Sequence, residues 1–91
     1  DCLTLWINNL LFEDPGLSED DMARKAEELV AALREGPPVC VLVINEVGLG
    51  IVPESPLSRR FRDLSGRCAQ IVAAAADEVY FTVAGIAKRI K

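Results

Sequence analysis

Apolar side chains recur at helical spacing in two long segments of the chain, and polar residues at the ends of each segment mark where a helix should begin and stop. The first apolar stripe is Met22, Ala26, Leu29, Val30 and Leu33. Ser18 precedes it, with Asp21 three residues later as a variant of the capping box, and Gly36 with two prolines follows it. These features predict a helix from about residue 19 to residue 35.

The second stripe is Leu57, Phe61, Leu64, Cys68, Ile71, Val72 and Ala75. Ser55 is a suitable N-cap and Pro56 stands at the first helical position, so we expect a helix that runs to about Ala76. Gly66 inside this helix indicates a close approach of another backbone. Residues 2–12, "CLTLWINNLLF", predict a short helix or turn with Trp6 in the core.

Two other segments have the composition of buried strands. Residues 39–44, "VCVLVI", are apolar on both faces, which is typical of a central parallel strand covered by helices on each side. Residues 78–84, "EVYFTVA", predict a second strand, and after Gly85 the basic stretch "AKRIK" predicts a short edge strand that turns back. The alternation of helices and strands predicts an α/β fold with its strands parallel in one sheet. So few strands do not make a stable sheet covered on both faces, so we expect further strands outside this chain.

Composition narrows the class of protein. The chain has 91 residues, at most one small domain, and its net charge of −4 disfavours binding to nucleic acid. It contains no histidine and three widely spaced cysteines, which argues against a zinc site or a disulfide framework and favours a reducing cytoplasm. Cys40 lies within the apolar run and is expected to be a buried thiol. No apolar stretch is long enough to span a membrane.

The stretch after the first predicted strand carries the candidate ligand-binding residues. Asn45 and Glu46 would lie at the carboxyl end of that strand, where parallel sheets bind ligands, and Gly48 and Gly50 permit unusual conformations or close approaches. The next helix opens with a run of arginines, of which Arg59 and Arg60 would suit a phosphate or carboxylate. Glu46 is a candidate general base or ligand of a metal-bound water.

Each of these features also has a structural interpretation. The stretch is then a connector, with Arg59 paired to Asp63 one turn along the helix and Glu46 capping a loop amide. Asp1 would end a preceding strand, where an acid commonly holds Mg²⁺ in phosphate-transfer folds, although terminal acids are usually just solvated. No GxxxxGK[ST] or GxGxxG motif occurs, so the residues alone indicate part of a parallel α/β domain with a candidate ligand loop.

Three stretches carry a family resemblance: "DCLTLWINNLLF", "NEVGLGIVPESPLSRRFRDLSGR" and "AAAADEVYFTVAGIAKRIK". Together they resemble the C-terminal half of the bifunctional adenosylcobinamide kinase / adenosylcobinamide-phosphate guanylyltransferase family, over essentially the whole chain. The run from Asn45 to Glu54 is long and unusual, which makes the resemblance specific.

The resemblance implies a P-loop-type (RecA-like) three-layer domain, with a mostly parallel sheet and a C-terminal antiparallel edge strand. It implies phosphorylation of adenosylcobinamide from ATP or GTP, and then transfer of GMP from GTP through a guanylylated histidine to give adenosyl-GDP-cobinamide. It places Asp1 on the side of nucleotide and Mg²⁺, bound directly or through water. The corrinoid, the nucleotide and an N-terminal half are the implied partners, and we expect a homo-oligomer.

The family's phosphate loop and its histidine both lie upstream of the matched residues. Residues 1–91 are therefore expected to be a partial single domain that lacks the P-loop half and is inactive alone. The alternative from another functional class is a non-catalytic fragment that only binds, or assembles with, a partner half.

Overall fold

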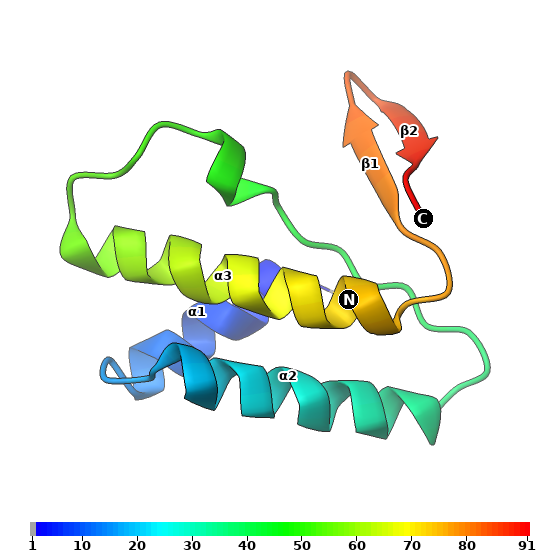
Figure 1. Cartoon of the computed structure of the whole chain (residues 1–91), viewed down its shortest axis with the longest axis horizontal. Coiled ribbons are helices and arrows are strands. Elements are labelled where there is room, and N and C mark those ends of the chain that lie inside the picture. Colours follow the sequence, from blue (N-terminus) through cyan, green and yellow to red (C-terminus); the bar gives the residue numbers. More distant parts are fainter. Residues whose placement is uncertain (1) are drawn as a thin grey trace.

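The computed structural model describes residues 2–91, and helices account for most of that range (Figure 1). The elements in chain order are α1 (Leu3–Glu13), α2 (Glu19–Arg34), the short 3₁₀ helix η1 (Val47–Leu49), α3 (Pro56–Ala75), β1 (Tyr80–Val83) and β2 (Ile86–Arg89). The predicted helices and the predicted hairpin are confirmed, so the chain is a small α/β unit. Among the described residues, no helix is long and apolar enough to cross a membrane.

Both long helices begin where their capping residues predicted. The Asp21 N–H donates to Ser18 Oγ at 3.0 Å and the Ser18 N–H donates to Asp21 Oδ2 at 3.1 Å, which completes a capping box. These bonds, first the one from the Ser18 backbone, lower the pKa of the Asp21 carboxyl, and Arg24 adds to the effect. At the start of α3, the Ser58 N–H donates to Ser55 Oγ at 3.4 Å, with Pro56 as the first helical residue.

The core lies where α1, α2 and α3 meet. Figure 1 shows α2 and α3 side by side, with α1 passing behind them. The buried apolar residues are Leu3, Ile7, Leu11, Leu17, Met22, Ala26, Leu64 and Cys68. Burial raises the pKa of the Cys68 thiol to about 11, so this cysteine stays a protonated, unreactive core residue at neutral pH. Trp6 and Phe61 are half-buried against this core, as predicted for both residues. Leu57, the first residue of the second stripe, is instead 57% exposed.

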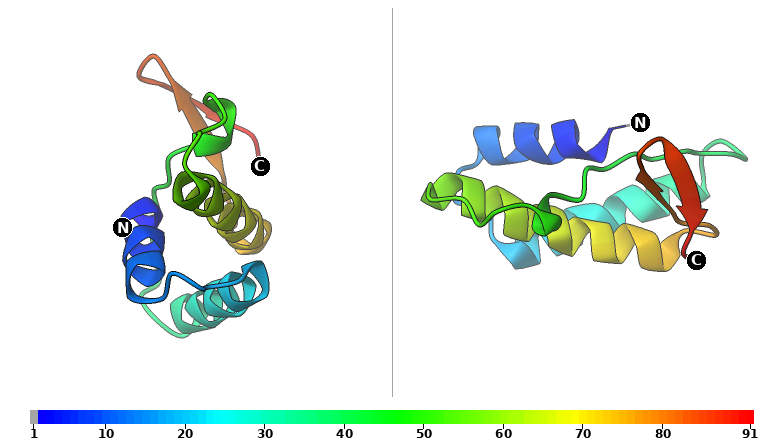
Figure 2. Two further views of the ribbon diagram at one scale, coloured as in Figure 1. Left: turned by 90° about the vertical axis from the view of Figure 1, so that its left-hand side faces the viewer. Right: turned by 90° about the horizontal axis from the view of Figure 1, so that it is seen from above.

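Residues 39–44, hereafter the extended segment, correct one prediction. Seen from above in Figure 2, the segment passes between α1 and α3, and Leu42 and Ile44 pack on the core. On its other face, Val39, Val41 and Val43 are 78%, 69% and 56% exposed. The expectation that both faces are covered is therefore wrong for the described residues, because the helices of this chain lie on one side only. Cys40 is likewise exposed, not buried.

Within residues 2–91, parallel strand pairing is limited to one isolated bridge. It joins Cys2 to Val43, and the Leu3 N–H donates to the Val43 carbonyl at 2.8 Å. Within the described residues, the one regular sheet is instead the antiparallel pair β1–β2. The predicted parallel partnership of β1 with the extended segment is not formed there.

The C-terminal hairpin matches the predicted edge strand. β1 and β2 pair from Tyr80–Arg89 to Val83–Ile86. Ala84 and Gly85 have φ values of 51° and 75°, as a two-residue type I′ turn requires. The Lys91 ammonium donates to the Ala73 and Ala74 carbonyls, each at 2.9 Å, which ties the strand pair to the C-terminal end of α3.

Gly66 does not have the role that its position in a helix suggested. It is exposed, and a Cβ built there would meet no heavy atom within 4 Å. The expectation of a close backbone contact at Gly66 is therefore wrong for the described residues.

Candidate functional site

Residues 45–54, hereafter the polar loop, connect the extended segment to α3 by an arch above that helix (Figure 1). Midway along the loop, η1 lies against α3. Successive short turns shape the path: the Val47 N–H donates to the Asn45 carbonyl at 3.0 Å, and the Gly50 N–H to the Val47 carbonyl at 3.3 Å. The loop is therefore an irregular but hydrogen-bonded structure.

The near end of the polar loop is attached to α1. The Asn45 N–H donates to Thr4 Oγ1 at 3.0 Å, across 41 positions in the sequence. The Asn45 and Glu46 residues themselves are exposed, as a ligand-facing role requires. Sequence reasoning missed Thr4, because the pattern gave only a hydroxyl in the first turn of a short helix.

The two loop glycines differ in what they permit. A Cβ on Gly48 would lie 3.2 Å from Glu46 Oε1, so the glycine leaves room for that carboxylate. A Cβ on Gly50 would lie 3.5 Å from the Val47 carbonyl oxygen, which is an ordinary contact. Neither glycine has a positive φ. Close approach, and not backbone freedom, is therefore what Gly48 supplies.

The far end of the loop is held by an arginine of α3. Arg59 Nη1 donates to the Pro53 and Glu54 carbonyls at 3.3 and 2.9 Å. The alternative pairing of Arg59 with Asp63 is not what the structure shows, since Asp63 lies 3.7 Å from Arg62. These bonds make Arg59 a loop anchor in this structure, and its phosphate contact stays a prediction.

Arg60 points toward the junction between α1 and α2 and not toward the polar loop. Its Nη2 donates to the Leu17 carbonyl, and its Nε is buried without a hydrogen-bond partner. The guanidinium therefore serves as a link between α3 and the α1–α2 turn. Its predicted contact with a phosphate stays a prediction as well.

A polar groove of about 400 Å³ lies beside the loop, over the middle of α3. Its lining residues are Glu19, Gly48, Arg62, Asp63, Gly66, Arg67 and Gln70. Cationic and anionic side chains balance each other there, so the groove has no strong preference for one sign of charge. Gly48 is the one candidate residue that it shares with the polar loop.

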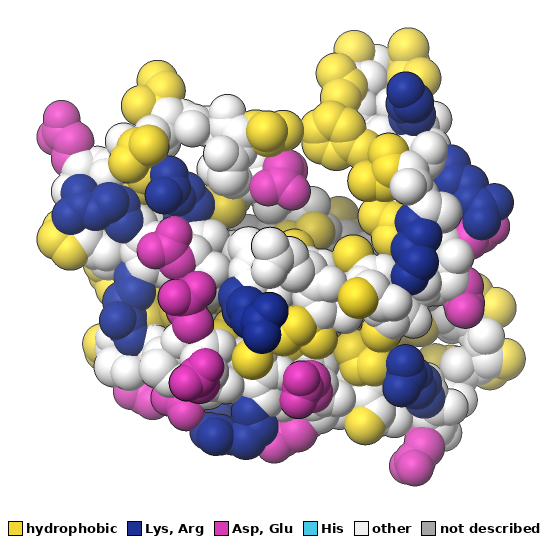
Figure 3. All heavy atoms as spheres, in the orientation of Figure 1, with side chains coloured by type: hydrophobic (Ala, Val, Ile, Leu, Met, Phe, Trp, Pro, Cys, Tyr) yellow, Lys and Arg dark blue, Asp and Glu magenta, His cyan; other side chains and the backbone are white. Residues whose placement is uncertain are grey.

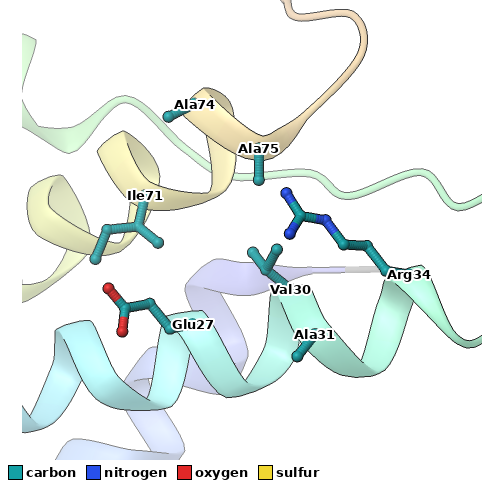
Figure 4. Close-up of a pocket in the computed structure, with 7 residues that line it drawn as sticks. All are labelled: Glu27, Val30, Ala31, Arg34, Ile71, Ala74 and Ala75. Carbon is teal, nitrogen blue, oxygen red and sulfur yellow. The ribbon is translucent and has the colours of Figure 1, made fainter.

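A second groove, of about 340 Å³, lies between the C-terminal parts of α2 and α3 (Figure 4). Its lining is mostly apolar, and Figure 4 shows the Glu27 carboxylate and the Arg34 guanidinium on the α2 side. It is remote in sequence from the loop and contains none of the candidate residues.

The space-filling view shows charged side chains across the two helices and apolar ones gathered on the hairpin (Figure 3).

The described residues do not assemble a metal site of their own. No group of three or more His, Cys, Asp or Glu residues that could hold an ion occurs among residues 2–91. Asp1, the residue predicted to hold Mg²⁺, lies outside the described residues.

These features define an α/β unit with an anchored polar loop at the end of its extended segment. Residues 1–90 match the sequence model of the CobU family, described as cobinamide kinase / cobinamide phosphate guanyltransferase, and the chain belongs to this family. The resemblance drawn from the sequence is thereby confirmed.

Curated relatives agree with this assignment. The chain is 44% identical over 101 residues to the bifunctional adenosylcobalamin biosynthesis protein CobU of Escherichia coli K12, and 45% identical to the Salmonella typhimurium protein of the same name. It is 44% identical over 92 residues to the bifunctional adenosylcobalamin biosynthesis protein CobP of Pseudomonas aeruginosa. All of this chain is covered, but only 56%, 56% and 51% of those proteins. The chain thus spans about half the length of its curated relatives.

Proposed function

We propose that this chain is the C-terminal half of a bifunctional transferase that phosphorylates adenosylcobinamide and then transfers GMP from GTP to the phosphate. The match of residues 1–90 to the cobinamide kinase / cobinamide phosphate guanyltransferase family carries the proposal. The intact protein then takes ATP or GTP and a corrinoid as substrates in the cytoplasm, and its subunits form a homo-oligomer.

The fold proposed for the intact protein is a P-loop-type, three-layer domain. The exposed valines of the extended segment support it, since contiguous apolar surface left bare by one set of helices is typical of a face that another layer covers. The parallel bridge between Cys2 and Val43 supports it too, because it has the pairing direction of a parallel sheet. The phosphate loop and the guanylylated histidine belong to the N-terminal half in this proposal.

The polar loop borders the substrate site in this proposal. It follows the carboxyl end of the extended segment, which is where open parallel sheets bind ligands. Asn45 and Glu46 are exposed there, so the amide can orient a polar group of the substrate, and the carboxylate can accept a proton or a hydrogen bond. Asp1 keeps its proposed role beside the Mg²⁺ of the nucleotide, since Mg²⁺ is commonly held by one or two carboxylates together with substrate phosphates.

The assay of the intact protein tests the proposal. Incubated with adenosylcobinamide and γ-labelled ATP or GTP, the intact protein should give a labelled corrinoid phosphate, and with α-labelled GTP it should give the GMP adduct. The 91-residue chain alone should give neither, because it has no phosphate-binding loop. An intact protein that labels no corrinoid would favour the non-catalytic alternative. Activity of the purified chain would contradict the need for a second half.

A further inference from the structure

We infer that Thr4 is a positioning residue whose hydroxyl fixes the start of the polar loop against α1, so that Asn45 and Glu46 are presented to the substrate in one orientation. The inference rests on the proposed function for its catalytic consequence, but not for the contact itself. Its basis is the 3.0 Å bond from the Asn45 N–H to Thr4 Oγ1.

The Thr4 hydroxyl accepts a hydrogen bond from the Asn45 N–H that a backbone carbonyl would accept in a continuous parallel ladder. At the Cys2–Val43 bridge, the Leu3 N–H donates to the Val43 carbonyl. If the parallel strand pairing continued, the next hydrogen bond would be donated by the Asn45 N–H to the Leu3 carbonyl. The chain turns into α1 at Leu3, however, and a helix uses that carbonyl for its own i to i+4 bond. The Asn45 N–H therefore needs another acceptor, and the Thr4 side chain supplies it from the next residue along the chain.

The bond from Asn45 to Thr4 is one of three contacts that hold the polar loop, and it lies next to Glu46. Arg59 holds the far end through the Pro53 and Glu54 carbonyls, and η1 rests against α3 in the middle. Thr4 provides the corresponding bond at the near end, immediately before Glu46. Misplacement of a site group by about 1 Å can lower a rate by ~10²-fold, so the anchoring of this end matters for a loop that borders a substrate.

The intact protein with Thr4→Val and Thr4→Ser separates anchoring from packing. Valine keeps the branched shape and removes the acceptor, whereas serine keeps the hydroxyl. In Thr4→Val, we expect the Asn45 amide to exchange about fivefold faster, the loss of one ordinary hydrogen bond, and kcat/KM for adenosylcobinamide to fall about fivefold or more. Thr4→Ser should stay within about twofold of the parent in both measurements, which a role in packing alone does not predict.

The two measurements also distinguish this inference from the proposed function. Unchanged exchange at Asn45 in Thr4→Val would overturn the anchor. Faster exchange with an unchanged kcat/KM would overturn the positioning role. If the parent protein itself does not act on adenosylcobinamide, the proposed function fails, and the exchange rates still decide whether Thr4 holds the loop.

Discussion

Replacement of Val41 by aspartate should destabilise the intact protein by more than about 3 kcal/mol, because a carboxylate would be placed on a face that we propose is buried by the N-terminal half. In this chain the same side chain is 69% exposed. In the isolated chain, the helical signal in circular dichroism should therefore stay unchanged within error. Urea unfolding of the intact protein and circular dichroism of the chain measure the two effects.

The matched control is Val41→Thr, which keeps the branched shape and adds only one hydroxyl. It should fall between the parent and Val41→Asp in the free energy of unfolding of the intact protein. Equal stability of the intact parent and Val41→Asp would show that this face of the extended segment stays in water, and the proposed covering layer would be wrong.

Replacement of Glu46 by glutamine should lower kcat/KM of the intact enzyme by about 10²-fold, the usual size of a positioned acid–base contribution. The substitution keeps the size of the side chain and removes its charge. Because Glu46 is exposed, the melting temperature of the Glu46→Gln enzyme should differ from that of the parent by less than about 2 °C, as is usual for surface positions.

Glu54→Gln is the matched control, since Glu54 is also exposed and belongs to the same loop. It should retain nearly full activity, because its carbonyl, and not its carboxylate, holds the loop through Arg59. If Glu46→Gln loses stability but keeps its activity per folded molecule, Glu46 is a structural residue and the polar loop is only a connector at that point.

Local chemistry made the helices predictable. Ser18 with Asp21, and Ser55 with Pro56, act through bonds and dihedral preferences that involve a few neighbouring residues, so the sequence window contains all that decides them. The hairpin was predictable for the same reason, since Gly85 and the basic stretch after it are local signals. The position of the polar loop after an extended segment also followed from the sequence.

Long-range contacts were not predictable in the same way. The environments of Thr4 and Arg60 depend on which backbone groups the packing of the helices brings near them. Thr4 meets an N–H 41 positions away, and Arg60 reaches a carbonyl 43 positions away. The apolar composition of the extended segment likewise predicts that both faces are covered, but it does not show that residues 2–91 leave Val39, Val41 and Val43 exposed. The predicted close contact at Gly66 was wrong because an exposed helical glycine and a closely packed one look alike in a sequence.

Amide hydrogen exchange across residues 39–44, compared between the isolated chain and the intact protein, tests most directly whether this chain is one half of a larger α/β domain. If these residues form an inner parallel strand of the intact domain, their amides should exchange slowly there and faster in the isolated chain, where Val39, Val41 and Val43 are exposed to water. Equal exchange in the two proteins would contradict the claim that this chain is one half of a larger α/β domain.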